Sequence, residues 1–301
     1  MSWIDSELMR AFAAEATDAY RLWTGADGWV ERLGQDVLLS FKKQTACVRI
    51  TSEYFLWADA VGFKGQRLFQ RFLPKRNHER EAPKLVVGDS NISSRSIVRE
   101  RGLQYQVEFS GGYSVGLFID QRENRSFVRK LAPERMLNCF AYTCSFSVVA
   151  AVTRANTVSI DLSQKSLERG RENFALNNLP ATGHRFIAED VFEILPELAR
   201  KDEKFDLIVL DPPTFSRSHR GKTFQVESDF ERLFTTALEV ADRDCRILLS
   251  TNCAALNERA LEVMARFCLK ASRRAGSFHS LQLPLEFPRG SGASTVWIRL
   301  R

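Results

Sequence analysis

The fold of this chain is decided by the stretch from Arg135 to Asp211, which begins with RMLNCFAYTCSFSVVA at 135–150. Positions 136–140 are typical of a strand, the more polar 141–145 of a turn, and the apolar residues that follow of a helix. Next, TVSID at 157–161 is a second β-rich run that ends in a carboxylate. This order predicts a βαβ unit with two adjacent parallel strands.

Three predicted strands in this stretch end in an aspartate. Asp161 closes the run just described, Asp190 closes 185–190 (RFIAED), and Asp211 closes 205–211 (FDLIVLD) ahead of two prolines. The carboxyl ends of parallel strands lie along one edge, where open α/β sheets bind ligands. A single aspartate in such a place is more often a turn former or a helix cap. Three at one edge favour a shared ligand site.

The turn after the first strand has no glycine and no Gly-x-Gly-x-x-Gly pattern. It contains Thr143, Cys144 and Ser145 instead. A diphosphate needs close approach of the backbone, which glycine permits and these side chains hinder. Asp161 is placed to accept hydrogen bonds from both ribose hydroxyls of a nucleoside. The pattern favours a ligand with a nucleoside but no diphosphate, so S-adenosylmethionine (SAM) fits and NAD fits poorly.

The expected fold class is α/β, with two domains. Residues 118–301 are predicted to form a class I methyltransferase sheet of the Rossmann-like type, mostly parallel with an antiparallel last strand. Residues 1–117 are predicted to form a smaller N-terminal α+β domain that binds the substrate. Other expected segments are a helix within 1–20, a turn at 23–29, strands at 36–41 and 47–50, a hairpin around 104–112, and late strands at 246–250, 278–283 and 294–300.

Composition excludes several classes of protein. The chain has 301 residues, of which 44% are hydrophobic and 27% charged, as in ordinary globular proteins. No apolar run approaches the length that crosses a membrane, and we expect a cytoplasmic protein. The six cysteines form no Cys-x-x-Cys pair and no group with the four histidines that is typical of a metal site, so no metal is expected.

The positive charge is uneven along the chain. Residues 64–101 carry ten basic and four acidic residues, and this difference of six equals the whole net charge of +6. An isolated basic run is usually a solvated surface. Beside a domain that binds a nucleoside cofactor, it favours a polyanionic partner, and RNA is the partner we expect. The basic residues are Lys64, Arg67, Arg71, Lys75, Arg76, Arg80, Lys84, Arg95, Arg99 and Arg101.

From about Gly102 to the C-terminus the chain resembles the bacterial 23S ribosomal RNA large-subunit methyltransferases, both the cytosine-C5 enzymes and the guanine-N7 half of a bifunctional enzyme. Residues 21–115 resemble more loosely the central domain of that family, and its N-terminal PUA RNA-binding domain is not recognisable. Cys144 departs from the family, which usually has glycine there. The matching segments are GLFIDQR at 116–122, LNCFAYT at 137–143, DLS at 161–163 and DPPTFS at 211–216.

The resemblance implies the roles of the cofactor-binding residues. Phe140, Tyr142 and Thr143 would line the methionine end of SAM, whereas Asp161 in the Asp-Leu-Ser segment would hold the ribose. The full implied set of cofactor-binding residues is Asp120, Arg122, Phe140, Tyr142, Thr143, Asp161, Ser163, Asp190, Val191 and Asp211, with Asp190 and Val191 at the adenine and Asp120 and Arg122 closing over the cofactor.

The implied catalytic residues are Asp211, Pro213 and Cys253. Asp211 and Pro213 would frame the gate between the cofactor methyl and the target base. Cys253 falls where the cytosine-C5 relatives have their nucleophile, which must add to C6 before C5 can react. Residues 211–220 resemble the guanine-N7 relative more closely, so a guanine nitrogen is slightly preferred as the target. The alternative for Cys253 is an ordinary half-buried thiol.

The predicted function is therefore SAM-dependent methylation of an RNA base, with ribosomal RNA as substrate. Two alternatives stay open. One is a methyltransferase of a small molecule or a protein, and the other is a non-catalytic RNA-binding relative that has lost cofactor affinity through Cys144. The sequence does not decide between a monomer and a homodimer.

Overall fold

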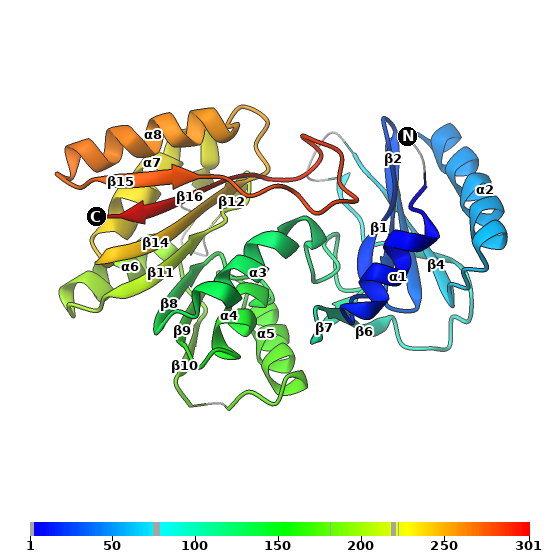
Figure 1. Ribbon diagram of the computed structural model, residues 1–301, viewed down its shortest axis with the longest axis horizontal. Coiled ribbons are helices and arrows are strands. Elements are labelled where there is room, and N and C mark those ends of the chain that lie inside the picture. The colour runs from blue at the N-terminus through cyan, green and yellow to red at the C-terminus, as the bar shows by residue number, and fades with distance from the viewer. Residues whose placement is uncertain (1–2, 75–78, 181, 218–220, 222) are drawn as a thin grey trace. The chain divides into compact units, whose positions relative to one another are not determined.

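The computed structural model describes residues 3–74, 79–180, 182–217, 221 and 223–301 (Figure 1). The chain divides into two compact units, Met1–Ile119 with Leu285–Pro288, and Asp120–Pro284 with Arg289–Arg301. The loop between the last two strands thus contributes four residues to the first unit, which the sequence alone does not indicate. The predicted roles of the two domains remain proposals.

The first unit is a five-stranded sheet with two helices. Strands β1, β2 and β3 are antiparallel neighbours, β4 is parallel to β3, and β5 is antiparallel to β4. Helices α1 and α2 pack on one face, where aromatic and aliphatic side chains form a buried core. The bounds are α1 Ser6–Ala14, β1 Ala19–Gly25, β2 Gly28–Leu33, β3 Asp36–Phe41, α2 Gln44–Val61, β4 Arg67–Phe72 and β5 Lys84–Val87.

Two local predictions for this unit are wrong, and a third is confirmed only in its centre. The predicted strand at 47–50 lies inside α2, where the buried positions 46, 47, 50, 54 and 58 have helical spacing. The predicted turn at 23–29 is confirmed at Ala26 and Asp27, whereas the residues on either side belong to the hairpin strands β1 and β2. The hairpin expected around Gly111 instead turns at Arg101 and Gly102, which both have positive φ. It joins β6, Arg95–Glu100, to β7, Leu103–Glu108.

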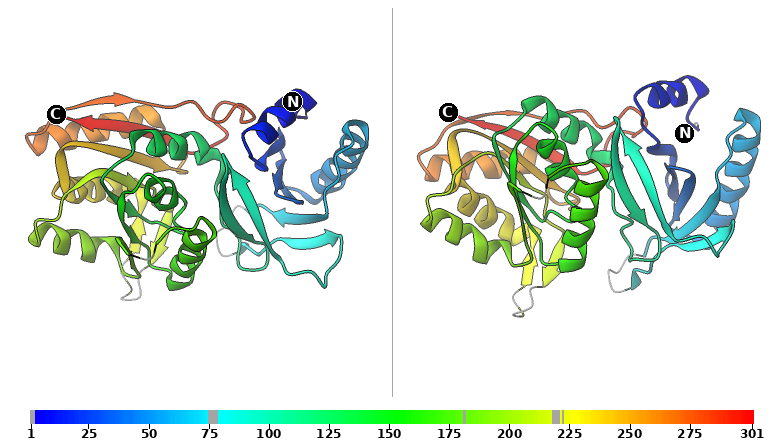
Figure 2. Two further views of the ribbon diagram at one scale, coloured as in Figure 1. Left: turned by 60° about the horizontal axis from the view of Figure 1, so that its bottom comes forward. Right: turned by 90° about the horizontal axis from the view of Figure 1, so that it is seen from below.

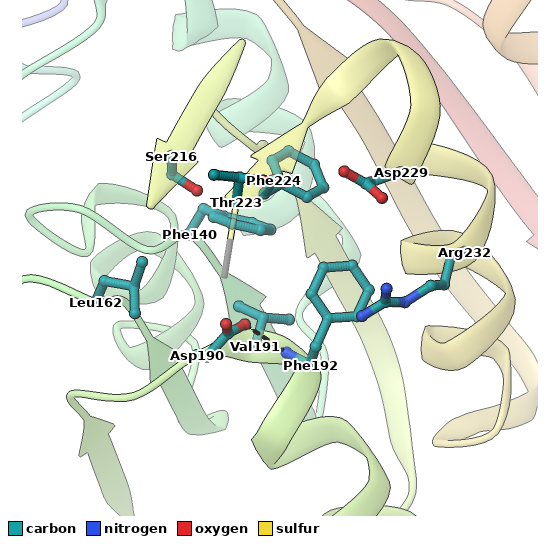
Figure 3. Close-up of a pocket in the computed structure, with 10 residues that line it drawn as sticks. All are labelled: Phe140, Leu162, Asp190, Val191, Phe192, Ser216, Thr223, Phe224, Asp229 and Arg232. Atoms are coloured by element: carbon teal, nitrogen blue, oxygen red, sulfur yellow. Dashed lines mark hydrogen bonds between the residues drawn. The ribbon is translucent and has the colours of Figure 1, made fainter. Parts of the chain in front are cut away.

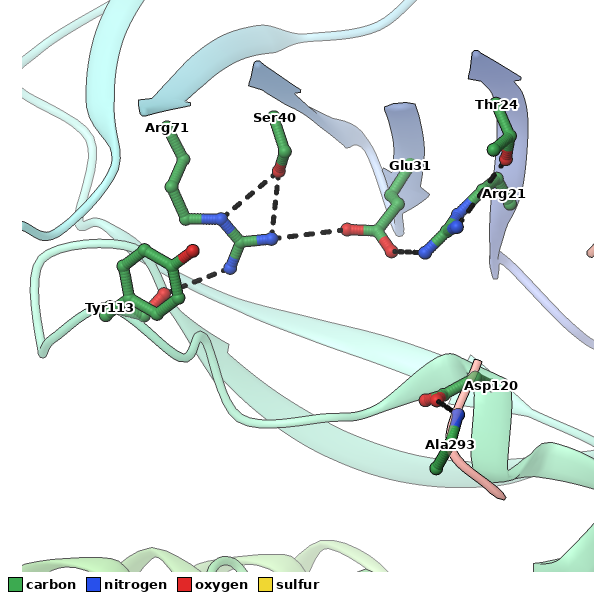
Figure 4. A network of polar contacts seen from close by, with 8 residues as sticks. All are labelled: Arg21, Thr24, Glu31, Ser40, Arg71, Tyr113, Asp120 and Ala293. Atoms are coloured by element: carbon green, nitrogen blue, oxygen red, sulfur yellow. Dashed lines mark hydrogen bonds and ion pairs between the residues drawn. The ribbon is translucent and has the colours of Figure 1, made fainter. Parts of the chain in front are cut away.

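The other face of this sheet carries buried ion pairs (Figure 4). Glu31 accepts from Arg21 at 2.9 Å and lies 3.8 Å from Arg71. Arg71 also donates to the Ser40 hydroxyl, and Arg67 forms a bidentate pair with Asp36 at 2.8 Å. Two residues of the basic stretch are therefore held inside the fold and are not free to meet a polyanion, contrary to what their place in that stretch suggests.

The second unit is a seven-stranded sheet in the order β10-β9-β8-β11-β14-β16-β15 (Figure 2). The first five strands are parallel, β16 is antiparallel to β14, and β15 is antiparallel to β16. The predicted fold class is confirmed. The strands are β8 Arg135–Cys139, β9 Asn156–Ile160, β10 His184–Ile187, β11 Phe205–Leu210, β14 Ala241–Thr251, β15 Gly276–His279 and β16 Ser294–Leu300.

Helices cover both faces of this sheet. Side chains of β8 alternate, so Leu137 and Cys139 join the core beneath α6, α7 and α8, whereas Asn138 faces α4 and donates to Ser147 at 2.9 Å. A short hairpin of β12, Phe215–Arg217, and β13, Thr223–Gln225, precedes α7. The helices are η2 Ile119–Gln121, α3 Arg122–Leu131, α4 Ser145–Ala151, α5 Gln164–Leu176, α6 Val191–Arg200, α7 Val226–Leu238 and α8 Glu258–Ala271.

The register of the parallel strands places their carboxyl ends in one row. Cys139 pairs with Ile160 and with Leu210, Ile160 pairs with Ile187, and Leu210 pairs with Leu249. The residues that follow these five positions therefore share one edge of the sheet. Within the described ranges, no helix is long and apolar enough to cross a membrane.

Candidate active site

The turn after β8 has an unusual backbone. Phe140, Tyr142 and Cys144 have φ values of 58°, 50° and 59°, which is the left-handed region that glycine adopts most easily. Each such residue costs on the order of 1 kcal/mol. Asp161 braces the turn, because its carboxylate accepts the backbone N–H of Tyr142 and that of Ser163, both at 2.8 Å. The strained turn is thus fixed by the carboxylate that would hold a ribose.

Cys144 fits this turn because the helix beside it has a glycine. A Cβ at Gly170 of α5 would lie 2.5 Å from the Sγ of Cys144, so any larger residue would collide with the thiol. Burial raises the pKa of Cys144 to about 12, and the thiol is neutral at physiological pH. Cys144 is therefore a packed apolar side chain, although its φ of 59° lies in the region that glycine adopts most easily.

Asp161 and Ser163 stabilise the local fold, and Asp161 can also bind a ligand. Ser163 caps α5, because its Oγ accepts the N–H of Ser166 at 3.1 Å. Burial raises the pKa of Asp161, although the two backbone N–H groups oppose this shift. Each carboxylate oxygen accepts one of these bonds and has a second lone pair, so two ribose hydroxyls can still donate to it.

A pocket of about 300 Å³ opens beside this turn (Figure 3). That volume is at the lower end of the range for small-ligand sites, about 300 to 1,000 Å³. Phe140, Asp190 and Val191, three of the predicted cofactor residues, line it together. The complete lining is Phe140, Leu162, Asp190, Val191, Phe192, Ser216, Thr223, Phe224, Asp229 and Arg232.

The chemistry of this pocket suits a purine. Figure 3 shows that Leu162, Val191 and the ring of Phe140 surround the pocket, and that the carboxylate of Asp190 lies beside Val191. Asp190 caps α6 by accepting the N–H of Phe192 at 2.9 Å, so its carboxylate is held in place. Apolar walls with a few fixed polar groups are usual in small-molecule and cofactor sites. The residues present therefore fit SAM, whose adenine would lie here and whose ribose would lie at Asp161.

Several pocket residues were not predicted. Phe224 comes from the short β12–β13 hairpin, and its ring lies 5.5 Å from that of Phe140 and 6.0 Å from that of Phe192. Arg232 of α7 stacks its guanidinium 3.9 Å from the Phe192 ring. Phe224 and Arg232 come well after β11 in the sequence, and no local motif marks them as ligand residues.

Asp211 directly follows β11 at the same edge of the sheet. Burial raises the pKa of Asp211 from 3.8 to about 6, although a hydrogen bond from the Ser250 hydroxyl lowers it. The nearby charge of Asp120 also raises this pKa, whereas that of Arg125 lowers it. Arg125 is 1% exposed and was not predicted to take part. The carboxylate thus titrates near the pH at which the enzyme would work.

The raised pKa predicts a stability cost at Asp211. Because the folded protein holds this proton more tightly than the unfolded chain, stability is lost as pH rises from about 4 to about 6. Asp211→Asn keeps the shape and can still accept from Ser250. At pH 7.5 we expect the variant to have a free energy of unfolding higher than wild type by about 1–3 kcal/mol, and at pH 4 an equal one. Urea denaturation at both pH values measures this; equal stability at pH 7.5 would contradict it.

The other predicted residues lie in η2, in α3, and in the turns after β8 and β11. The Oδ2 of Asp120 accepts the N–H of Ala293 at 3.1 Å (Figure 4). Arg122 is 2% exposed in the first turn of α3, and its Nε lies 3.6 Å from Oε1 of Glu123. Pro213 is exposed next to the site. The carbonyl of Thr143 accepts from Asn173, which fixes the end of the β8 turn.

Cys253 lies two residues beyond β14, the strand next to β11. It is 6% exposed, and its Sγ lies 3.3 Å from Oε1 of Glu227 in the first turn of α7. Thr251 accepts its backbone N–H at 3.1 Å. Glu227 was not predicted, because no motif links it to a cysteine 26 residues later. The thiol of Cys253 is thus placed to donate a hydrogen bond to the Glu227 carboxylate.

All six cysteines are free and buried. Burial raises the pKa values of Cys139 and Cys245 far above the usual range, so these thiols stay protonated. In the part of the chain that the structure describes, no group of three or more His, Cys, Asp or Glu side chains is arranged to hold a metal ion.

Three curated relatives match part of this chain in sequence. The chain is 34% identical to Ribosomal RNA large subunit methyltransferase I of Aeromonas salmonicida over 65% of its own length and 50% of the relative's. It is 31% identical to the Aeromonas hydrophila enzyme of the same name, over 72% of its own length and 55% of the relative's. It is 40% identical to Ribosomal RNA large subunit methyltransferase K/L of Psychrobacter arcticus, over 52% and 21%. The chain spans about half the length of the first two.

Solved structures share the fold. SMU.776, a methyltransferase crystallised with SAH, superposes with a TM-score of 0.83 at 24% identity and covers 97% of this chain and 78% of that one. The SAM-dependent methyltransferase of Agrobacterium tumefaciens gives 0.74 at 19% identity, over 94% and 90%. Residues 42–298 match the family model described as S-adenosylmethionine-dependent methyltransferase. The predicted resemblance is confirmed, and the chain belongs to the family of SAM-dependent methyltransferases.

Proposed function

We propose that this methyltransferase transfers the methyl group of SAM to a base of ribosomal RNA, with cytosine C5 as the target atom. The substrate class is supported by the names of the matched relatives, which are ribosomal RNA large subunit methyltransferases. The observation that carries the target atom is the thiol of Cys253 beside the Glu227 carboxylate at the edge of the sheet that holds Asp211. The comparisons do not support the preference for a guanine nitrogen.

The chemistry at cytosine C5 requires a nucleophile from the protein. SAM supplies a methyl group on a sulfonium, so the chain must align the acceptor and exclude water. The thiolate of Cys253 adds to C6, and Glu227 is placed to accept the thiol proton. This addition makes C5 nucleophilic. After transfer, solvent water takes the C5 proton, and the electron pair of that C–H bond restores the double bond between C5 and C6. The bond between sulfur and C6 breaks at the same time and releases the thiolate.

Asp211 and Pro213 have a different proposed role. They follow the strand beside β8, where the cofactor turn lies, and they would frame the gap between the methyl group and the base. Asp211 can hydrogen bond the Watson–Crick edge of a base, and its titration near pH 6 lets it do so as acceptor or as donor. Asp161, Asp190 and the β8 turn would hold SAM.

The RNA surface is proposed to include the exposed members of the basic stretch. Arg67 and Arg71 are buried in ion pairs, and Lys75 and Arg76 lie outside the described residues. Ser218, His219 and Arg220, which resemble the guanine-N7 relative, also lie outside them. Arg80 is exposed, with its guanidinium 4.9 Å from the ring of Tyr113.

Arg80→Ala is expected to make RNA binding less sensitive to salt. Each phosphate contact on single-stranded RNA contributes about −0.7 to the slope of log K against log salt, so the slope should flatten by about that amount. Fluorescence anisotropy with a labelled ribosomal RNA fragment measures it. Arg49→Ala is the matched control, because Arg49 is paired with Glu53 at 2.8 Å on α2. Equal slopes for wild type and Arg80→Ala would remove this residue from the RNA surface.

A labelling experiment tests the substrate class. Purified protein with tritium-labelled SAM should label protein-free large-subunit ribosomal RNA or an assembly intermediate, and nucleoside digestion should place the label in 5-methylcytidine. Label in another nucleoside would overturn the target atom only. Label in protein or in small molecules, with none in RNA, would overturn the substrate class.

A further inference from the structure

A second pocket lies in the first unit, lined by β1, by the segment that leads into α1 and by residues Leu285–Pro288. Its volume is about 440 Å³, so it is larger than the pocket beside the β8 turn and within the range of small-ligand sites. Every residue of its lining belongs to the first unit. The proposed transfer of a methyl group makes no use of this pocket.

An aromatic wall of this pocket is fixed by the fold. The indole of Trp3 lies 5.9 Å from that of Trp23 and 5.0 Å from that of Trp57, at interplanar angles of 27° and 17°. Nε1 of Trp57 donates to the carbonyl of Ile4 at 3.2 Å, and the N–H of Ile4 donates to the carbonyl of Leu22 at 2.9 Å. The segment that carries Trp3 is therefore held against both α2 and β1.

Phe287 contributes a further aromatic ring to the lining. It is 7% exposed although it lies in the loop between β15 and β16, and Cζ of Arg21 is 4.1 Å from the centre of its ring. Arg21 is itself held by Glu31, whose Oε1 accepts from Nη2 of Arg21 at 2.9 Å (Figure 4). The basic side chain of the lining is thus neutralised.

Two carboxylates complete the lining, those of Asp5 and Glu286. Asp5 is held in place because its Oδ1 accepts the N–H of Leu8 at 2.8 Å. A carboxylate only accepts hydrogen bonds and repels other anions, so this pocket suits a planar ligand that offers donors. Guanine has two adjacent donors, N1–H and N2–H, on its Watson–Crick edge. Adenine and cytosine have an acceptor nitrogen beside the amino group, which a carboxylate repels.

We propose that this pocket takes up an unpaired guanine of the RNA substrate, in addition to the base that is methylated. The inference rests on the proposed function in taking RNA as the ligand. The base would lie against the aromatic lining, and its N1–H and N2–H would donate to a carboxylate of Asp5 or Glu286. Phosphate contacts carry no sequence information, so a pocket for one base would give the first unit a means of selecting a sequence.

The test is a titration with short single-stranded RNA, followed by the indole N–H signals in a nitrogen–proton NMR spectrum. Assignment uses the Trp→Phe variants. The pentamer UUGUU should shift the signals of Trp3 and Trp23, which line the pocket, and leave that of Trp297 in β16 unchanged. The pentamer UUAUU should bind about tenfold more weakly or less, because it lacks the paired donors.

A double variant tests the two carboxylates. Asp5→Asn with Glu286→Gln removes both, and asparagine is also a favoured residue at the start of a helix, so α1 keeps its cap. This variant should bind UUGUU about tenfold more weakly than wild type and lose the preference over UUAUU. Glu7→Gln with Glu15→Gln is the matched control. It removes two exposed carboxylates near the ends of α1 that lie outside the lining, and it should bind like wild type.

Three results would overturn the proposal. The first is that UUGUU leaves the signals of Trp3 and Trp23 unchanged, and the second is equal binding of UUGUU and UUAUU to the wild type. The third is a stronger shift of these signals by octa-arginine than by UUGUU, which would assign the pocket to a basic protein segment. The titration involves no methyl transfer. If RNA is labelled with tritium and UUGUU does not bind here, only this inference fails, whereas label confined to protein or small molecules removes the proposed function whatever UUGUU does.

Discussion

Cys253→Ala should abolish methyl transfer to RNA and leave SAM binding intact. Without addition at C6, C5 of cytosine has too little electron density to attack the methyl group, so loss of the thiol removes the nucleophilic step itself. Removal of a catalytic nucleophile commonly costs a thousandfold or more, and we expect a loss of at least about that size in kcat. Single-turnover transfer and calorimetry with SAM measure the two quantities.

Cys268→Ala is the matched control for this substitution. Cys268 is a buried thiol of α8 in the same hydrophobic core as Cys253, and its pKa is raised by burial. That variant should retain activity. RNA containing 5-fluorocytosine should trap the wild-type enzyme as a complex that survives denaturation, because the C5 substituent cannot leave. If Cys253→Ala retains most of its activity, the target is a ring or exocyclic nitrogen and the thiol is structural.

Asp161→Ala should weaken SAM binding by roughly ten- to a hundredfold. Hydrogen bonds to a charged group contribute about 1.5 to 3 kcal/mol, which corresponds to that range of affinity. The carboxylate also accepts the N–H groups of Tyr142 and Ser163, so its loss releases the strained turn after β8 as well. Calorimetric titration of SAM into each protein gives the dissociation constants.

Asp59→Ala is the control for that measurement, because Asp59 is exposed on α2 and far from the cofactor turn in sequence. It should bind SAM like the wild type. An Asp161→Ala variant with wild-type affinity would mean that the ribose is held elsewhere and that Asp161 only braces the turn.

Much of the catalytic sheet follows from local sequence. The apolar runs at 136–140 and 205–211 are strands because Leu, Ile and Val are buried on both faces of a parallel sheet. Once these strands are parallel and in register, the residues after them must share an edge. The row that includes Asp161 and Asp211 could therefore be predicted without any contact information.

What could not be predicted depends on contacts between distant residues. Ser250 and Gln121 are separated by 129 positions, and nothing near either one indicates that they meet. The sequence alone suggests that Arg67 is a surface cation, whereas in the structure it is buried in an ion pair with Asp36. Cys47 belongs to a helix although its β-branched neighbours favour a strand, because the packing of α2 on the sheet decides its conformation.

Quantitative mass spectrometry of nucleosides tests the central claim most directly. Large-subunit ribosomal RNA from cells that lack this gene should be missing one 5-methylcytidine, and the purified enzyme with SAM should restore it while Cys253→Ala should not. Ribosomal RNA with an unchanged set of methylated nucleosides in the deletion strain would contradict the claim.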